Sequence, residues 1–119
     1  MSANPQIEWC QKSGQECLRF CFGERLTEKE ADIAITVWKD AFQSKRDKSV
    51  TLIWDCKNMK GYETGARDKW TKALKEMKGQ IASIWLISDS AIIRMGASVM
   101  GLLSALKIRP ISSESDIAI

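Results

Sequence analysis

The protein has 119 residues, of which 45% are hydrophobic and 28% charged, with a net charge of +3 and no histidine. A chain of this size holds one core and leaves no room for a separate catalytic module, so we expect a single domain over residues 1–119. Lysines and arginines are spread along the chain rather than clustered. The charge pattern therefore does not call for a nucleic-acid partner.

Hydropathy favours a soluble cytoplasmic protein without a transmembrane segment. The longest apolar stretch, residues 91–106, is interrupted by Arg94, Ser98 and Ser104, whereas a membrane span needs about 20 mostly apolar residues. The opening MSANPQIEW lacks the charged and then apolar pattern of a signal peptide. The four cysteines form no CxxC pair, so we expect no metal site and mainly reduced thiols.

A β-hairpin is predicted at the start of the chain. The segment IEWCQKSGQECLRFCF alternates apolar and polar residues on both sides of Ser13–Gly14, which is typical of strands joined by a two-residue turn. This register places Trp9 opposite Leu18 and Cys10 opposite Cys17. A slip by one residue would turn the apolar side chains outward, so their pairing supports the register. A disulfide between Cys10 and Cys17 is the alternative to four free thiols.

Helices and strands then alternate along the chain. Thr27 and Glu30 form a capping box, and apolar residues follow at helical spacing. Pro110 places the last strand at a sheet edge. We predict helices over 28–44, 64–78 and 91–106, strands over 50–54, 81–87 and 107–111, and a capped helix start in SSESDIAI. The order predicts an α/β fold: a mixed, mainly parallel sheet with an N-terminal β-hairpin and right-handed β/α crossovers.

Catalytic motifs are absent from the sequence. Without histidine, a serine or cysteine nucleophile lacks its commonest general base. Neither the glycine-rich dinucleotide motif nor the P-loop is present, so we expect no cofactor. Asp55, Glu63 and Asp89 lie near the ends of predicted strands, where ligands collect in open α/β sheets. Because no constellation of reactive groups is visible, we expect a non-enzymatic protein.

Two stretches of sequence carry a family resemblance. The predicted strand ending at Asp55 followed by CKNMKGYETGARDKW, and then IASIWLISDSAIIRMGASVMGLLSALKIRPISSESDI, resemble the SpoIIAA-like proteins of the STAS superfamily. This is the fold of bacterial anti-sigma factor antagonists, and the resemblance runs from Cys17 to the end of the chain. It implies a signalling role without enzymatic activity and a protein partner bound at the loop after Asp55. By fold the family is also similar to Sec14-type lipid-binding domains.

The resemblance breaks at the phosphorylation site. In the antagonists this loop ends in Asp-Ser-Ser-Gly, and the second serine is phosphorylated at a helix start. Counting from Asp55, these positions hold Glu63, Thr64, Gly65 and Ala66, so the phosphoacceptor is absent. Thr64 is the remaining hydroxyl. Glu63 either supplies a permanent charge where the phosphate would lie or, with Thr64, caps the following helix.

Two functional hypotheses follow. The first is an interaction domain that binds a protein through two loops. The second is a carrier or sensor of a small apolar ligand or lipid, because methionines on the third predicted helix suit irregular apolar ligands; the same helix surface could instead form a homodimer. The residues concerned are Asp55, Lys57, Tyr62, Glu63, Thr64, Gly65 and Arg67 in the first loop, Ser88, Asp89, Ser90 and Arg94 in the second, and Met95, Met100 and Leu103 on the apolar helix.

Overall fold

The structure is a computed structural model that describes residues 3–118. Strands β1 (Gln6–Lys12) and β2 (Gln15–Cys21) form the predicted antiparallel hairpin, with Trp9 opposite Leu18 and Cys10 opposite Cys17. Ser13 and Gly14, in the turn, have φ values of 51° and 80°. Two-residue hairpin turns of type I′ require positive φ at both positions, and glycine meets this requirement without strain.

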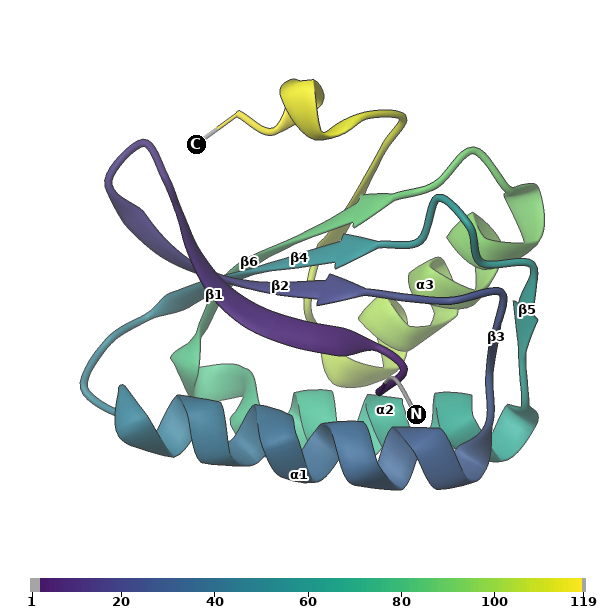
Figure 1. Ribbon diagram of the computed structural model, residues 1–119, viewed down its shortest axis with the longest axis horizontal. Helices are drawn as coiled ribbons and strands as arrows, with labels where there is room; N and C mark the ends of the chain where they lie inside the picture. The colour runs from purple at the N-terminus through teal and green to yellow at the C-terminus, as the bar shows by residue number, and fades with distance from the viewer. Residues whose placement is uncertain (1–2, 119) are drawn as a thin grey trace.

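The hairpin continues into a five-stranded sheet of order β1-β2-β4-β6-β7 (Figure 1). All neighbouring strands after the hairpin run parallel. The added strands are β4 (Val50–Asp55), β6 (Ile81–Ile87) and β7 (Ile108–Ile111). The predicted mixed and mainly parallel sheet is therefore confirmed, with the strand that contains Pro110 at its edge.

Three helices connect successive parallel strands of this sheet. Helix α1 (Glu28–Ser44) begins at the predicted capping box of Thr27 and Glu30. Helix α2 (Thr64–Met77) continues into a 3-10 turn, η1 (Lys78–Gln80), and the Gln80 side chain donates to the carbonyls of Phe42 and Lys45, both at 2.8 Å. Both carbonyls also accept a backbone N–H, from Lys45 and Lys48, so the amide adds a second bond to each at the end of α1.

Helix α3 (Ala91–Ser104) ends two residues before the predicted boundary. Ala105 adopts a left-handed conformation with a φ of 57°, and the Leu106 N–H then donates to the Gly101 carbonyl at 3.0 Å. A Cβ on Gly101 would lie 2.8 Å from the Leu106 carbonyl oxygen. The glycine therefore allows the chain to turn back against the helix, although the apolar pattern continues to Leu106.

All three helices cover the same face of the sheet (Figure 1). Aromatic rings fill the centre of this layer. The ring centroid of Phe20 lies 5.2 Å from that of Trp38 and 5.8 Å from that of Trp70, and both pairs meet edge to face. Edge-to-face contacts of this kind add about 0.5–1.5 kcal/mol each beyond the burial of apolar area.

The opposite face of the sheet is covered by the C-terminal segment, which crosses it above the sheet in Figure 1. Ile53 and Ile87 are fully buried there and pack against Ile117. The helix predicted in SSESDIAI is only a 3-10 turn, η2 (Glu114–Asp116). We call this segment the C-terminal strap, because its single turn places Ile117 against the sheet.

Two short strands were not predicted from the sequence. β3 (Arg25–Leu26) pairs parallel with β5 (Gly61–Tyr62), with Leu26 opposite Tyr62. Each has two residues, too few to show the alternation that identifies a strand. This small second sheet fixes the loop after β4 beside the start of α1.

Candidate functional site

The two loops predicted to form a site lie at the same edge of the sheet. Strands β4 and β6 run parallel with Asp55 opposite Ile87, and the Cys56 N–H donates to the Ile87 carbonyl at 2.9 Å. The carboxyl ends of parallel strands meet at one edge. The loops that follow β4 and β6 are therefore neighbours, as the sequence predicted.

Asp55 is buried where β4 meets the first loop, and its Oδ1 accepts from the Lys57 backbone N–H at 3.2 Å. Its side chain is on the face of the sheet away from the helices, buried, with Oδ2 2.9 Å from the Arg19 Nη2. Arg19 also pairs with Glu114 of η2, and Lys12 Nζ lies 2.5 Å from the Glu114 Oε2. Asp55 therefore does not share an exposed surface with Tyr62, because its buried carboxylate lies on the far face of the sheet, whereas Tyr62 packs against the helix-side core. Asp55 instead helps hold the C-terminal strap.

Glu63 occupies the N-cap position of α2 but makes no side-chain cap bond there. Its Oε1 accepts from the backbone N–H of Glu28, at 2.7 Å, at the start of α1. The predicted cap therefore acts on a different helix, which the β3–β5 pairing brings within reach. A carboxylate at that position satisfies a free N–H and interacts favourably with the helix dipole.

The position of the family's phosphorylated serine is occupied by Gly65. A Cβ on Gly65 would lie 2.0 Å from Oε1 of Glu28, so any side chain here requires that carboxylate to move. Thr64 is exposed at the first position of α2. With Glu28 and Glu63 both at this helix start, a phosphate would meet like charges.

The second loop forms a cap rather than a pocket wall. Ser90 accepts from the Ile93 N–H at 3.4 Å, and the Ser88 hydroxyl accepts from the Ser90 N–H at 3.1 Å. Arg94 donates through Nε to the Ser88 carbonyl at 2.6 Å, and its Nη2 lies 3.9 Å from Oδ1 of exposed Asp89. Ser90 is therefore the N-cap of α3.

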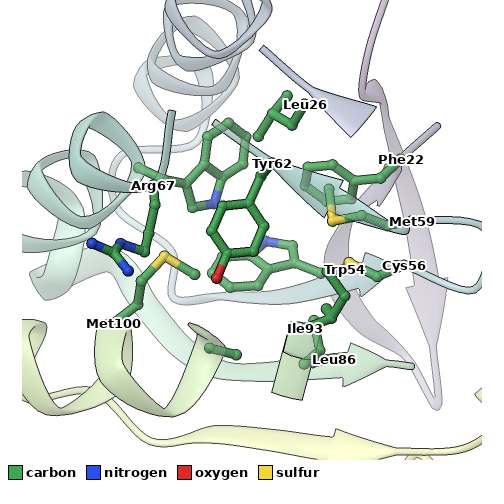
Figure 2. A pocket seen from close by; sticks show the side chains of 12 residues that line it. Phe22, Leu26, Trp54, Cys56, Met59, Tyr62, Arg67, Leu86, Ile93 and Met100 are labelled. Atoms are coloured by element: carbon green, nitrogen blue, oxygen red, sulfur yellow. The ribbon is translucent and has the colours of Figure 1, made fainter. Parts of the chain in front are cut away.

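An apolar cavity of about 50 Å³ lies between the sheet, α2 and α3, beneath β5 (Figure 2). Its single charged lining residue is Arg67, which is half-buried. The other lining residues are apolar or aromatic: Phe22, Leu26, Trp54, Cys56, Met59, Tyr62, Trp70, Leu86, Ile93, Ala97 and Met100. Cavities with such walls stay dry and accept apolar groups.

Tyr62 lines this cavity and packs against α3. A Cβ on Gly96 would lie 2.0 Å from the Tyr62 hydroxyl oxygen and 2.9 Å from its Cζ. The ring therefore rests directly on the backbone of α3, which only glycine allows at this distance. Any ligand larger than a few water-sized groups requires Tyr62 or α3 to move.

Trp54 presents an unpaired polar group at the same place. Its ring lines the cavity and lies beneath Tyr62 in Figure 2. The residue is 2% exposed, and its Nε1 has no hydrogen-bond partner among the described residues. A buried N–H without a partner is uncommon in proteins. Trp54 was not among the predicted site residues, because an aromatic residue in a buried strand normally signals core packing.

The three apolar residues predicted to share one surface of α3 lie on two different surfaces. Met100 lines the cavity, whereas Met95 and Leu103 are 68% and 58% exposed. They belong to an apolar stripe on the outer side of α3. The stripe consists of Ile92, Met95, Val99, Leu102 and Leu103.

The cysteines are all free thiols in the structure, including the Cys10 and Cys17 pair. Burial raises the pKa of Cys56, which lines the cavity, far above its usual range. Burial also raises the pKa values of Cys10 and Cys17. Because the thiolate is the reactive form, these groups are weak nucleophiles at neutral pH.

Fold and site together define an α/β domain with a small apolar cavity at the carboxyl edge of its sheet and an apolar stripe on the adjoining helix. No protein-family model and no curated protein match the chain. A solved structure from Shewanella loihica PV-4 does match, with a TM-score of 0.77 and 13% identity over 98% of this chain and 94% of that one. That protein is described as an uncharacterized member of the DUF3478 family with a SpoIIAA-like fold. The chain therefore has a SpoIIAA-like fold, as its sequence predicted.

Between residues 3 and 118, no helix is long and apolar enough to cross a membrane. Within the same residues, no group of three or more acidic or cysteine side chains is placed to hold a metal ion.

Proposed function

We propose that this protein is a non-enzymatic interaction domain that binds a protein partner through the outer side of α3. The observation that carries the proposal is the apolar stripe, whose five large side chains are between 38% and 84% exposed. Contiguous exposed apolar surface of this kind marks interaction sites in globular proteins. It remains exposed here although the opposite side of the same helix, with Ile93 and Ala97, is buried in the core.

The loop after β4 adjoins this surface. Tyr62 contacts α3 at Gly96, one residue after Met95 of the stripe. Thr64, two residues after Tyr62, is exposed at the first position of α2. We therefore include Tyr62 and Thr64 as the polar border of the binding surface, a common arrangement around an apolar centre.

The absence of phosphorylation control is part of the proposal. Gly65 replaces the phosphoacceptor, and the Glu63 carboxylate is engaged at the start of α1. A partner that binds the stripe would meet the same charge at this helix start at all times. We therefore expect binding that is not switched by a kinase, in contrast to the antagonists that the sequence resembles.

The experiment is site-specific photo-crosslinking with a benzophenone side chain at position 102, performed in the native host. Position 37 on α1 is the matched control, since Val37 is also an exposed apolar residue of a helix. We expect a protein adduct from position 102 that is absent from position 37 and lost when Met95→Glu is added. Equal adducts from both positions, or none from position 102, would contradict the proposal.

A second candidate function is binding of a small apolar molecule that carries a hydrogen-bond acceptor. The specific observation is the unpaired Trp54 Nε1 in the wall of an apolar cavity. Arg67 lines the same cavity, so an anionic acceptor such as the carboxylate of a fatty acid suits both groups. Entry of such a ligand would require Tyr62 to leave Gly96.

Calorimetric titration with decanoate tests this candidate. Trp54→Phe keeps the aromatic ring but removes the N–H, and should weaken binding by about tenfold if the indole donates to the carboxylate. Trp85→Phe is the control, because Trp85 is also buried with an unpaired Nε1 but does not line the cavity. No heat of binding for the wild type, or equal affinity in both variants, would remove this candidate.

A further inference from the structure

We infer that the partner of the α3 stripe is a second copy of this chain, paired through α3 about a two-fold axis. The inference rests on the proposed function, in that it names the occupant of the same surface. Ile92, Met95, Val99 and Leu102 are spaced by three, four and three residues. This is the spacing of the inner positions of a two-helix coiled coil, in which side chains of one helix fit between those of another.

The stripe is continuous along α3. On a helix with 3.6 residues per turn, its five residues fall within about 100° of arc, and they extend over most of a helix about 21 Å long. Leu102 is the most exposed of them, at 84%. The helix is already held by the core on its other side, so pairing would not have to meet the entropic cost of folding it.

The surface beside Leu102 is complementary to such a projecting side chain. An open groove lies along the end of α3, bordered by Leu102 and lined by Ser98, Gly101, Ala105, Leu106, Ile108 and the exposed Lys107. A projecting leucine and a hollow therefore occur next to each other on one chain. A two-fold axis brings the same patch of both copies together, so each projection can meet the other copy's hollow.

The charge distribution favours a copy of the same chain over other occupants. The only charged residue of α3 is Arg94, and its Nε is bonded to the Ser88 carbonyl. Two neutral stripes can meet without burying an unpaired charge. A different protein is usually selected by complementary charges, and helices that lie on membranes carry several lysines or arginines beside the apolar face. The stripe offers neither feature.

The test is the mass of the full chain in solution by sedimentation velocity over a range of concentrations. We expect a species of twice the 13.4 kDa chain mass. Val99→Glu and Leu102→Glu should each weaken the dimer by at least tenfold. The matched control is Val37→Glu, since Val37 and Val99 are both helical valines, exposed by 44% and 38%. This control should remain dimeric, and far-ultraviolet circular dichroism should be the same for all variants.

A wild-type monomer at all concentrations would overturn the inference, as would a dimer that persists in Val99→Glu and Leu102→Glu. A monomer that still forms the position-102 adduct with another protein would leave the proposed function in place and overturn only the self-pairing. A monomer that sediments with vesicles of phosphatidylcholine and phosphatidylglycerol through the same residues would assign the stripe to a lipid surface instead.

Discussion

The hydroxyl of Tyr62 lies directly on the backbone of Gly96, and this contact joins the small β3–β5 sheet to α3. It brings together a loop residue and a helix residue that are 34 positions apart in the sequence. Tyr62 also lines the apolar cavity, and Gly96 follows Met95 of the exposed stripe. Any change at this point should affect both candidate binding features.

Gly96→Ala should destabilise the fold. An alanine in an open helix interior is normally more stable than glycine by about 1 kcal/mol, but here its Cβ would lie 2.0 Å from the Tyr62 hydroxyl. We expect a net loss of about 1–3 kcal/mol, typical of overpacking, measured by urea denaturation. Adding Tyr62→Ala should relieve the clash, so the two changes should be non-additive.

The control for Gly96→Ala is Gly79→Ala, because a Cβ on Gly79 meets no atom within 4 Å. Equal stability of the Gly96→Ala variant and the wild type would show that Tyr62 has no fixed position on α3. If the double variant is no more stable than the sum of the two single effects predicts, the strain caused by Gly96→Ala does not arise from Tyr62.

Replacing Glu63 by Ala should destabilise the start of α1 rather than that of α2. The Glu63 carboxylate accepts from the Glu28 N–H, and loss of a helix cap costs about 0.5–2 kcal/mol. Thr64→Val should have little effect, since the Thr64 side chain bonds to none of the described residues and is exposed. Amide hydrogen exchange would check this, with faster exchange expected in the first turn of α1. Faster exchange confined to α2 would contradict the assignment.

The free energy of unfolding should decrease in acid, partly because Glu114 becomes protonated. Its hydrogen bond from Lys12 and its contact with Arg19 hold its pKa below the usual value of 4.5. The unfolded chain therefore binds this proton more readily, so the contribution is complete above the unfolded pKa and is lost as pH falls through the folded pKa. Glu114→Gln should lower the urea midpoint at pH 7. The midpoint of this variant should also fall less than that of the wild type as the pH is lowered to about 3.

The control for the Glu114 effect is Glu76→Gln. Glu76 pairs with Lys39 at 3.1 Å, and both side chains are 45% exposed. Exposed pairs of this kind contribute little, so its pH profile should follow the wild type. A profile of Glu114→Gln that is parallel to the wild type at all pH values would show that the strap does not depend on this carboxylate.

Ile117→Ser should loosen the C-terminal strap from the sheet. Ile117 packs against the buried Ile53 and Ile87, and removing part of a half-buried isoleucine side chain should cost about 1–2 kcal/mol. Ile33→Ser on α1 is the control, because Ile33 is 57% exposed. Thermal unfolding should show a lower Tm for Ile117→Ser only. An unchanged Tm would mean that the strap adds no stability.

Local sequence determined most of the secondary structure. Alternation around Ser13–Gly14 set the hairpin register, because a slip of one residue would have reversed the inner and outer faces. Thr27 and Glu30 set the start of α1 through bonds between neighbouring residues. The long apolar runs at β4 and β6 identified buried strands, and their alternation with helices indicated the parallel sheet. The SpoIIAA-like fold was implied by the family resemblance of two stretches of sequence.

The tertiary structure decided the composition of the site. Glu63 caps α1 instead of α2, and Asp55 pairs with Arg19 on the far face, because each bond depends on a residue distant in sequence. The pattern of α3 showed an apolar circumference but could not show which side the sheet would cover. Packing partly buried Met100 and left Met95 exposed. Periodicity acts between neighbours in the chain, whereas a binding surface depends on which distant segments the fold brings together.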